Sequence, residues 1–272
     1  MSSSRASLVA FVCVSVTTSI VSCGDKPAAD PAPAATDVQV GALTPTQKVQ
    51  QRLAACAQDP RVLTGLVSQQ ICAGADIFLR ETFDGNGRTC GTCHPPQNNF
   101  TIDPTFINTL PPTDPLFVFK TNPALTDLER EPSLMLGGIL ENVDDPGTPF
   151  ADPTHKFSIR SVPHVLAMRT SITADAGDLN ATTPPLDRTG WAGDGGALHD
   201  FLNTAIVQHY PRTLARTTGA DFRLAIPAEL DLVDTFQRNL GRTSEPNIQQ
   251  VNMFDPGAHE GRIAYIDPMR GR

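Results

Sequence analysis

The sequence predicts a mainly α-helical fold with long irregular connections, and three observations support this class. Apolar residues recur at helical spacing in several separate segments. No convincing set of alternating strands is evident between those segments. The 272 residues include 24 prolines and 20 glycines, which interrupt regular structure and therefore predict long loops between the helices.

The first 22 residues are predicted to be a signal peptide of the lipoprotein type. Arg5 supplies a positive start, and the uncharged apolar stretch 8–21 is too short to cross a bilayer core of about 30 Å. The stretch ends in Ile20-Val-Ser-Cys23, which resembles a bacterial lipobox, so Cys23 is the predicted lipidation site. Ordinary secretory cleavage nearby is the alternative. Both interpretations predict export, and lipidation predicts a periplasmic protein anchored to a bacterial membrane.

Residues 23–44 are predicted to be a disordered tether, because a segment so rich in Pro and Ala cannot bury enough apolar surface to fold. Folded structure is expected from Thr44-Pro45, an N-cap residue followed by proline at the first helical position. A short helix then runs through Leu53 and Cys56. We assign residues 45–245 to one folded domain and residues 246–272 to a tail.

Further helices follow from apolar periodicity and from start and stop signals. One is expected at 197–209, with Leu198, Leu202, Ile206 and His209 on a shared face. Another is expected to begin at Pro227 and to end at Gly241 as its C-cap. The remaining expectations are a helix over 62–83, carrying Leu63, Leu66, Val67, Ile71, Ala75, Phe78 and Leu79 at helical spacing, and a short helix over 134–140 in an otherwise looped segment, 95–161.

Cys90-Gly-Thr-Cys93-His94 is a C-x-x-C-H sequence, the attachment signature of c-type haem. Two thiols about one helical turn apart can each form a thioether with a haem vinyl group, and the adjacent imidazole can bind the iron as the proximal ligand. The predicted cofactor is therefore one covalent haem c, held by Cys90, Cys93 and His94. Because only 6% of the residues are aromatic, a porphyrin would also supply planar bulk to the interior.

The other cysteines agree with this interpretation. Cys13 lies in the leader and Cys23 is the lipidation site, which leaves Cys56 and Cys72 as an expected disulfide in an oxidising compartment. A zinc site built from the last four cysteines is disfavoured, because structural zinc sites use two close pairs and 56 and 72 are far apart. A thioredoxin-like motif is disfavoured because the C-x-x-C follows a loop, 84–89, rather than a strand.

The surroundings of the motif resemble the di-haem cytochrome c peroxidase and related cytochrome family. The family has a short helix ending in an aromatic, a Gly/Asn turn into C-x-x-C-H, an Arg-x-Pro-x-Leu segment, an aromatic followed by His-Asp-Gly, and a helix after that glycine. The corresponding segments here are Gly74-Ala-Asp-Ile-Phe78, Gly85–His94, Arg160-Ser-Val-Pro163-His-Val-Leu166, Gly190-Trp-Ala-Gly-Asp-Gly195 and 198–209. The resemblance covers roughly residues 70–245 and implies a cytochrome c-like helical domain around the haem.

The chain departs from the family pattern in the number of haem motifs. The family has two C-x-x-C-H motifs and this sequence has one. Residues 261–272 faintly repeat residues 74–88, so the tail 246–272 is either the opening of a second haem domain or a chance match of a Gly/Arg-rich segment.

A second departure concerns the sixth iron ligand, because Gly193 stands where the family often has histidine. In the family's His/Met haems the methionine lies on the helix after the glycine, near Ala205. The resemblance therefore makes His209, one turn further along the same face, the first candidate. The alternatives are His164, Met168 and Met135. Each candidate can instead be an ordinary core residue, with a histidine hydrogen-bonded to the backbone.

Three further residues are candidates for contact with the haem. Arg88 and Arg160 can pair with the haem propionates, since a guanidinium matches a carboxylate fork, or they can be solvated surface residues. Trp191, the only tryptophan, is a candidate to pack against the porphyrin edge.

The composition and the C-x-x-C-H motif together limit the classes of function that the sequence supports. A formal charge of −8 with no basic run argues against a nucleic-acid partner. The leading hypothesis is one-electron transfer with a basic or neutral redox protein in the periplasm. The resemblance implies the alternative, a hydrogen peroxide reductase that would need a second haem or a partner to supply its second electron. The third hypothesis is a module without redox activity, in which the thiols serve only as a structural crosslink.

Overall fold

The computed structural model describes residues 42–129, 131–143, 157–172, 189–190, 196–244 and 247–267. The chain divides into two units, Met1–Ala42 and Leu43–Arg272, and every helix and strand given below lies in the second. The predicted signal peptide, the lipidation site Cys23, Trp191 and Gly193 lie outside the described residues. Within the described ranges, no helix is long and apolar enough to span a membrane.

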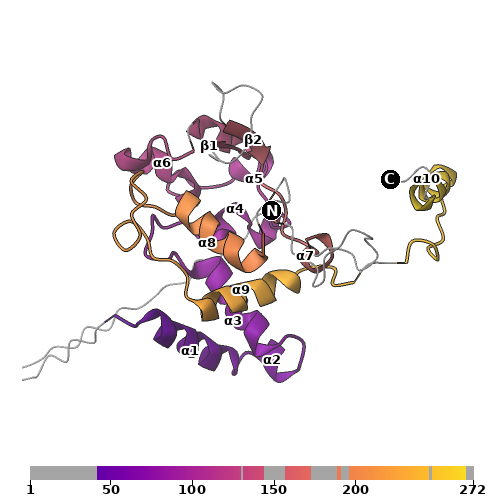
Figure 1. Cartoon of the computed structure of the whole chain (residues 1–272), viewed down its shortest axis with the longest axis horizontal. Coiled ribbons are helices and arrows are strands. Elements are labelled where there is room, and N and C mark those ends of the chain that lie inside the picture. The colour runs from indigo at the N-terminus through magenta and orange to yellow at the C-terminus, as the bar shows by residue number, and fades with distance from the viewer. Residues whose placement is uncertain are drawn as a thin grey trace, which may run out of the picture. The chain divides into compact units, whose positions relative to one another are not determined.

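The described part of the chain is mainly helical, which confirms the predicted class (Figure 1). The α-helices are α1 (Pro45–Cys56), α2 (Pro60–Leu63), α3 (Gln69–Arg80), α4 (Cys90–Cys93), α5 (Pro104–Ile107), α6 (Val118–Thr121), α7 (Met168–Ser171), α8 (Leu198–His209), α9 (Pro227–Arg238) and α10 (Pro256–Ile266). Short 3₁₀ helices cover Pro96–Asn98, Pro115–Phe117, Pro123–Leu125 and Pro132–Gly137. The described residues of the segment predicted as loop between 95 and 161 therefore include six short helices, five of which begin at proline.

Three of the predicted helix starts agree with the structure. Thr44 caps α1 and forms a capping box with Gln47, and α8 and α9 begin within one residue of their predicted positions. The predicted end of α9 is wrong, because the helix stops at Arg238 and Asn239 is its C-cap. Gly241 instead has a φ of +67° in the turn that follows α9.

The single helix predicted over residues 62–83 is wrong. α2 ends at Leu63, Gly65 adopts a left-handed φ of +72°, and Ser68 caps a new helix by accepting a hydrogen bond from the Ile71 amide. Leu63 and Leu66 are 68% and 74% exposed, so these two leucines belong to a turn rather than to the buried face.

A β-hairpin forms where no strand was predicted. Strands β1 (Ile139–Val143) and β2 (Phe157–Ser161) pair in antiparallel register, with Ile139 opposite Ser161 and Val143 opposite Phe157. The short helix predicted over 134–140 is instead the 3₁₀ helix Pro132–Gly137, which ends where Gly138 takes a φ of +70° and leads into β1.

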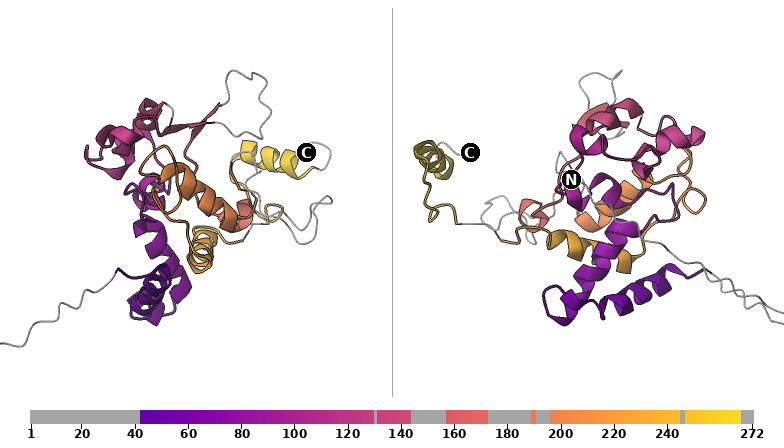
Figure 2. Two further views of the ribbon diagram at one scale, coloured as in Figure 1. Left: turned by 60° about the vertical axis from the view of Figure 1, so that its left-hand side comes forward. Right: turned by 180° about the vertical axis from the view of Figure 1, so that it is seen from behind.

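The main core forms where α3 crosses α9 (Figures 1 and 2). Gly74 permits the close approach, because a Cβ at this position would lie 2.0 Å from the carbonyl oxygen of Leu232. Phe78 and Phe236 contact each other across the crossing, with their rings tilted by 59° and the ring centroids 5.3 Å apart. α1 packs on the outer side of α3, and the Cys56–Cys72 disulfide joins these two helices.

A network of ion pairs fastens α1, α3 and α9 to one another. Arg52 pairs with Asp76 at 2.9 Å and with the buried carboxylate of Glu81. Arg223 pairs with Glu81 at 2.9 Å and with the fully buried Glu229 at 2.6 Å. Glu229 also accepts a hydrogen bond from the Ile226 amide and so caps the start of α9.

Candidate functional site

The C-x-x-C-H motif occupies a single helical turn, α4, whose start is fixed by neighbouring threonines. The Thr89 amide donates to the hydroxyl of Thr92 at 2.9 Å. The preceding loop is strained, because Phe83 and Asp84 both have positive φ angles. That loop is tied to the end of α8 by Asn86, whose side-chain amide donates to the carbonyls of His209 and Pro211 at 3.0 Å each. The motif is therefore held against α8.

His94 ends the turn, and its Nδ1 lies 3.0 Å from the carbonyl oxygen of Phe100. Burial lowers the pKa of His94; the Phe100 and Pro163 carbonyls oppose this shift, and the nearby His209 adds to it. A neutral imidazole whose proton sits on Nδ1 carries its lone pair on Nε2. The Phe100 carbonyl favours this tautomer, which a haem iron would require of His94, and the Pro163 carbonyl is a second acceptor for the ring.

Cys90 and Cys93 are free thiols. Burial raises the pKa of each to about 11, so both are protonated at neutral pH. The Tyr210 hydroxyl donates to the Cys90 sulfur at 3.2 Å. A thiol pair of this kind differs from a thioredoxin-like motif, which works through a thiolate of lowered pKa.

The four-cysteine zinc alternative is incompatible with the structure, because Cys56 and Cys72 are joined in a disulfide with their Cα atoms 5.8 Å apart. Among the described residues, no cluster of three or more His, Cys, Asp or Glu side chains is arranged to hold a metal ion.

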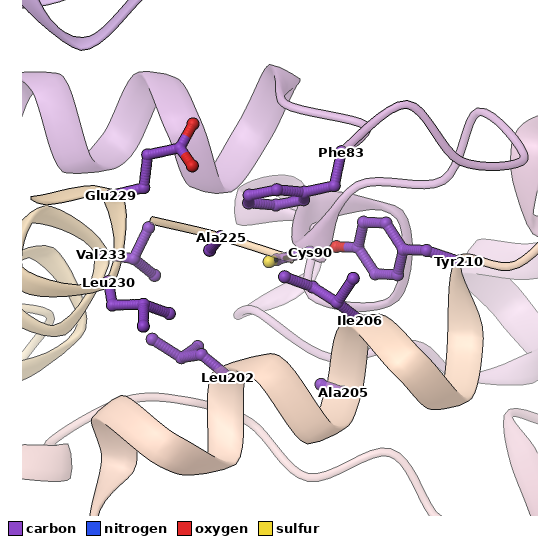
Figure 3. Close-up of a pocket in the computed structure, with 10 residues that line it drawn as sticks. All are labelled: Phe83, Cys90, Leu202, Ala205, Ile206, Tyr210, Ala225, Glu229, Leu230 and Val233. Atoms are coloured by element: carbon purple, nitrogen blue, oxygen red, sulfur yellow. Dashed lines mark hydrogen bonds between the residues drawn. The ribbon is translucent and has the colours of Figure 1, made fainter. Parts of the chain in front are cut away.

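A narrow apolar cavity adjoins Cys90 (Figure 3). In Figure 3 the Tyr210 hydroxyl points toward the Cys90 sulfur, with Phe83 on one side and Ile206 on the other. The remaining lining residues are Leu202 and Ala205 of α8, Glu229, Leu230 and Val233 of α9, and Ala225. The α8 residues are those predicted to share one face with His209.

The donor set of the site fits a haem, whereas the cavity beside Cys90 is too small to enclose one. Two unpaired thiols and an imidazole whose Nδ1 faces a carbonyl oxygen lie on one turn, as covalent attachment requires. The cavity beside Cys90 measures about 20 Å³, which is roughly the space for one water molecule. A porphyrin bound by these residues would therefore lie outside this cavity, on the partly exposed side of Cys90, Cys93 and His94.

Arg88 is not a solvated surface residue, and that alternative is wrong. The residue is 1% exposed, and its guanidinium donates to the carbonyls of Pro115 and Leu116 and pairs with Glu129. These contacts occupy most of its donors, so a propionate would have to compete with Glu129 for them.

Glu129 is a buried carboxylate, 3% exposed, beside the motif. Burial alone would raise the pKa of Glu129, but the charge of Arg88, together with contacts from His209 and Arg88, lowers it to about 2. Glu129 is therefore ionised over the physiological range and forms the centre of an Arg88–Glu129–His209 cluster.

Of the candidate sixth ligands, His209 is placed at the motif. Its Nδ1 lies 3.6 Å from Glu129 Oε1, and its charge lowers the pKa of His94. Met168 directs its sulfur to within 3.8 Å of the Gln237 amide nitrogen. His164 is exposed, and its Nδ1 accepts from the Leu166 amide.

Two other residues from the sequence analysis have different surroundings. Met135 is fully buried in a second core cluster, which Cys93 borders. Arg160 is half-buried on β2, opposite Leu140.

Sequence reasoning missed Glu129 and Tyr210. Glu129 lies in a looped segment without a motif, and its partner Arg88 is 41 residues away. Tyr210 directly follows His209 at the end of a predicted helix, and only the turn of the chain there brings its hydroxyl to Cys90.

Comparisons with protein-family models, curated proteins and solved structures found no match to this chain. We therefore infer the function from the chemistry of the site.

Proposed function

We propose that this protein is a c-type cytochrome that transfers single electrons in the cell envelope. A cytochrome c-like domain over residues 45–245 would carry one haem through Cys90, Cys93 and His94. The observation that carries the proposal is that two unpaired thiols on α4 are followed directly by an imidazole whose Nδ1 faces the Phe100 carbonyl. When bound, the haem supplies a one-electron couple whose potential depends on axial ligands, burial and hydrogen bonds.

The chain's own residues have distinct tasks in this proposal. Cys90 and Cys93 fix the cofactor covalently, and His94 binds its metal while Phe100 holds the ring orientation. His209 is the proposed sixth ligand, since Asn86 ties the loop before the motif to the His209 carbonyl and the ring of His209 faces Glu129 at 3.6 Å. The apolar α8 and α9 side chains around Cys90 exclude water from the cofactor edge.

The proposed setting is the periplasm, with the chain anchored to the membrane through lipid on Cys23. The partner would be a redox protein with a basic or neutral surface, since the formal charge of the chain is −8 and long-range steering favours opposite charge.

The test is expression of the full chain in a bacterial host that matures c-type cytochromes. A haem stain on a denaturing gel and an intact mass should show one covalent haem, and the mass also reports lipidation and the disulfide. Variants with Cys90→Ala and Cys93→Ala together should lose the stain. A colourless protein whose two thiols both alkylate after denaturation would overturn the proposal.

A peroxide reductase is the second candidate, and one observation favours it. The Glu129–His209 pair offers an acid–base group beside the motif that was not evident from the sequence. Reduction of peroxide takes two electrons, so a chain with one haem needs a second electron source. A six-coordinate low-spin spectrum that peroxide leaves unchanged supports electron transfer, whereas a high-spin fraction that turns over peroxide supports the enzyme.

A further inference from the structure

The Arg88–Glu129–His209 cluster joins three segments that are far apart in the sequence. Arg88 leads into the motif, Glu129 follows the 3₁₀ helix Pro123–Leu125, and His209 ends α8. Arg88 and Glu129 are 1% and 3% exposed. Desolvation of such a pair costs on the order of several kcal/mol per ion, and apolar residues of similar size often stabilise a fold better. The cost of burying the pair therefore favours a role beyond packing.

The contacts of Arg88 fix the orientation of the Glu129 carboxylate. Arg88 is anchored by the carbonyls of Pro115 and Leu116, the latter at 2.9 Å, and its fork holds both carboxylate oxygens of Glu129. One of these oxygens, Oε1, lies 3.6 Å from His209 Nδ1. This distance is slightly longer than that of a hydrogen bond, so the two groups face each other without forming a close hydrogen bond.

Metal binding through Nε2 would complete that contact. A neutral imidazole that ligates through Nε2 carries its only ring proton on Nδ1, and that proton needs an acceptor. Glu129 is in position to accept it. The arrangement parallels His94, whose Nδ1 is directed at the Phe100 carbonyl, but here the acceptor is a charged carboxylate.

We propose that Glu129, anchored by Arg88, is a positioning residue that holds His209 in the orientation to ligate the haem iron through Nε2. The inference rests on the proposed function, because it requires haem at Cys90, Cys93 and His94. An imidazole whose N–H is hydrogen-bonded to a carboxylate is a stronger electron donor to the metal than one whose N–H is hydrogen-bonded to a carbonyl. Glu129 therefore stabilises the ferric state and lowers the reduction potential.

The first measurement is the reduction potential of the haem-loaded chain and of its Glu129→Gln variant. We expect the variant to have a more positive potential. The shift is 59 mV for each tenfold decrease in the ratio of ferric to ferrous affinity for His209. External imidazole should bind the ferric variant roughly 10- to 100-fold more tightly, since loss of such an outer partner weakens the internal ligand by that factor. The matched control is Glu81→Gln, another buried ion-paired carboxylate, which should leave both values unchanged.

A second background tests whether Glu129 acts through His209. In His209→Met chains the ligand position has no ring N–H, so Glu129→Gln should shift the potential much less than in the native background. Equal shifts in the two backgrounds would mean that Glu129 acts as a distant charge, and the inference would be wrong.

The double variant Arg88→Met/Glu129→Met covers the case in which the single variant fails to fold, because it leaves no unpaired buried charge. It should reproduce the positive shift and the tighter binding of imidazole. Covalent haem with an unchanged potential and unchanged imidazole affinity would overturn the inference alone. Absence of covalent haem from the native chain would overturn the proposed function together with the inference.

Discussion

Gly74 on α3 lies against the backbone of Leu232 on α9, so closely that a Cβ on the glycine would come within 2.0 Å of the leucine carbonyl oxygen. The crossing of these two helices forms the main core, and α3 leads through a short loop to the C-x-x-C-H turn. The position of the candidate site thus depends on an approach that only glycine allows.

Gly74→Ala should therefore destabilise the fold, by about 2 kcal/mol or more, as expected for overpacking of a tight core. The measurement is the urea midpoint followed by circular dichroism. Gly261→Ala on α10 is the control, because nothing lies within 4 Å of the Cβ it would add, and it should stabilise its helix by roughly 0.5–1 kcal/mol. Equal effects of the two substitutions would contradict the packing explanation.

The Cys56–Cys72 disulfide should contribute measurably to stability. Its cysteines are 16 residues apart, and closing a loop of this length restricts the unfolded chain by about 3 kcal/mol. The Cys56→Ala/Cys72→Ala chain should lose a comparable amount in denaturant unfolding. Addition of a reductant should destabilise the native chain but not the double variant.

The ion-pair network predicts an acid-sensitive fold. Burial alone would raise the pKa of Glu81, but Arg52, Arg223 and Lys48 lower it below its ordinary value of 4.5. Because the pKa is lower in the folded state, this contribution is complete above pH 4.5 and is lost as the pH falls through the lowered value. Urea midpoints between pH 7 and pH 3 should fall less steeply for Glu81→Gln than for the native chain.

The thiols of the folded haem-free chain should react slowly. Burial raises the pKa of Cys90 and Cys93 from 9.0 to about 11, so the thiolate fraction at neutral pH falls by roughly a hundredfold. Iodoacetamide should label them rapidly only after denaturation. Labelling of the native chain at the rate of a free cysteine would show that the turn is open in solution.

Local signals predicted much of the fold. Thr44-Pro45 and Pro227 marked helix starts, and the apolar face of 197–209 marked α8, because caps and periodicity act within a few residues. The same kind of signal gave the wrong prediction of one helix over 62–83. The spacing of Leu63 and Leu66 fits a helix, but Gly65 and Ser68 interrupt it. The hairpin was missed because its strands pair across residues 144–156, beyond the reach of local patterns.

The candidate site likewise has a part that the sequence predicted and a part that it did not. Cys90, Cys93 and His94 are neighbours in the sequence, so their chemistry could be read directly. The burial of Arg88 and its pairing with Glu129 depend on tertiary contacts across 41 residues, for which a single sequence contains no signal. His209 was named as a candidate ligand, but the carboxylate that faces it was not.

The small size of the cavity beside Cys90 has a consequence for where a cofactor would sit. A space of about 20 Å³ holds one water molecule, so a flat macrocycle could not lie within it. Cys90, Cys93 and His94 are each partly exposed. A haem attached to them would occupy the open side of the turn, where a partner protein could approach its edge.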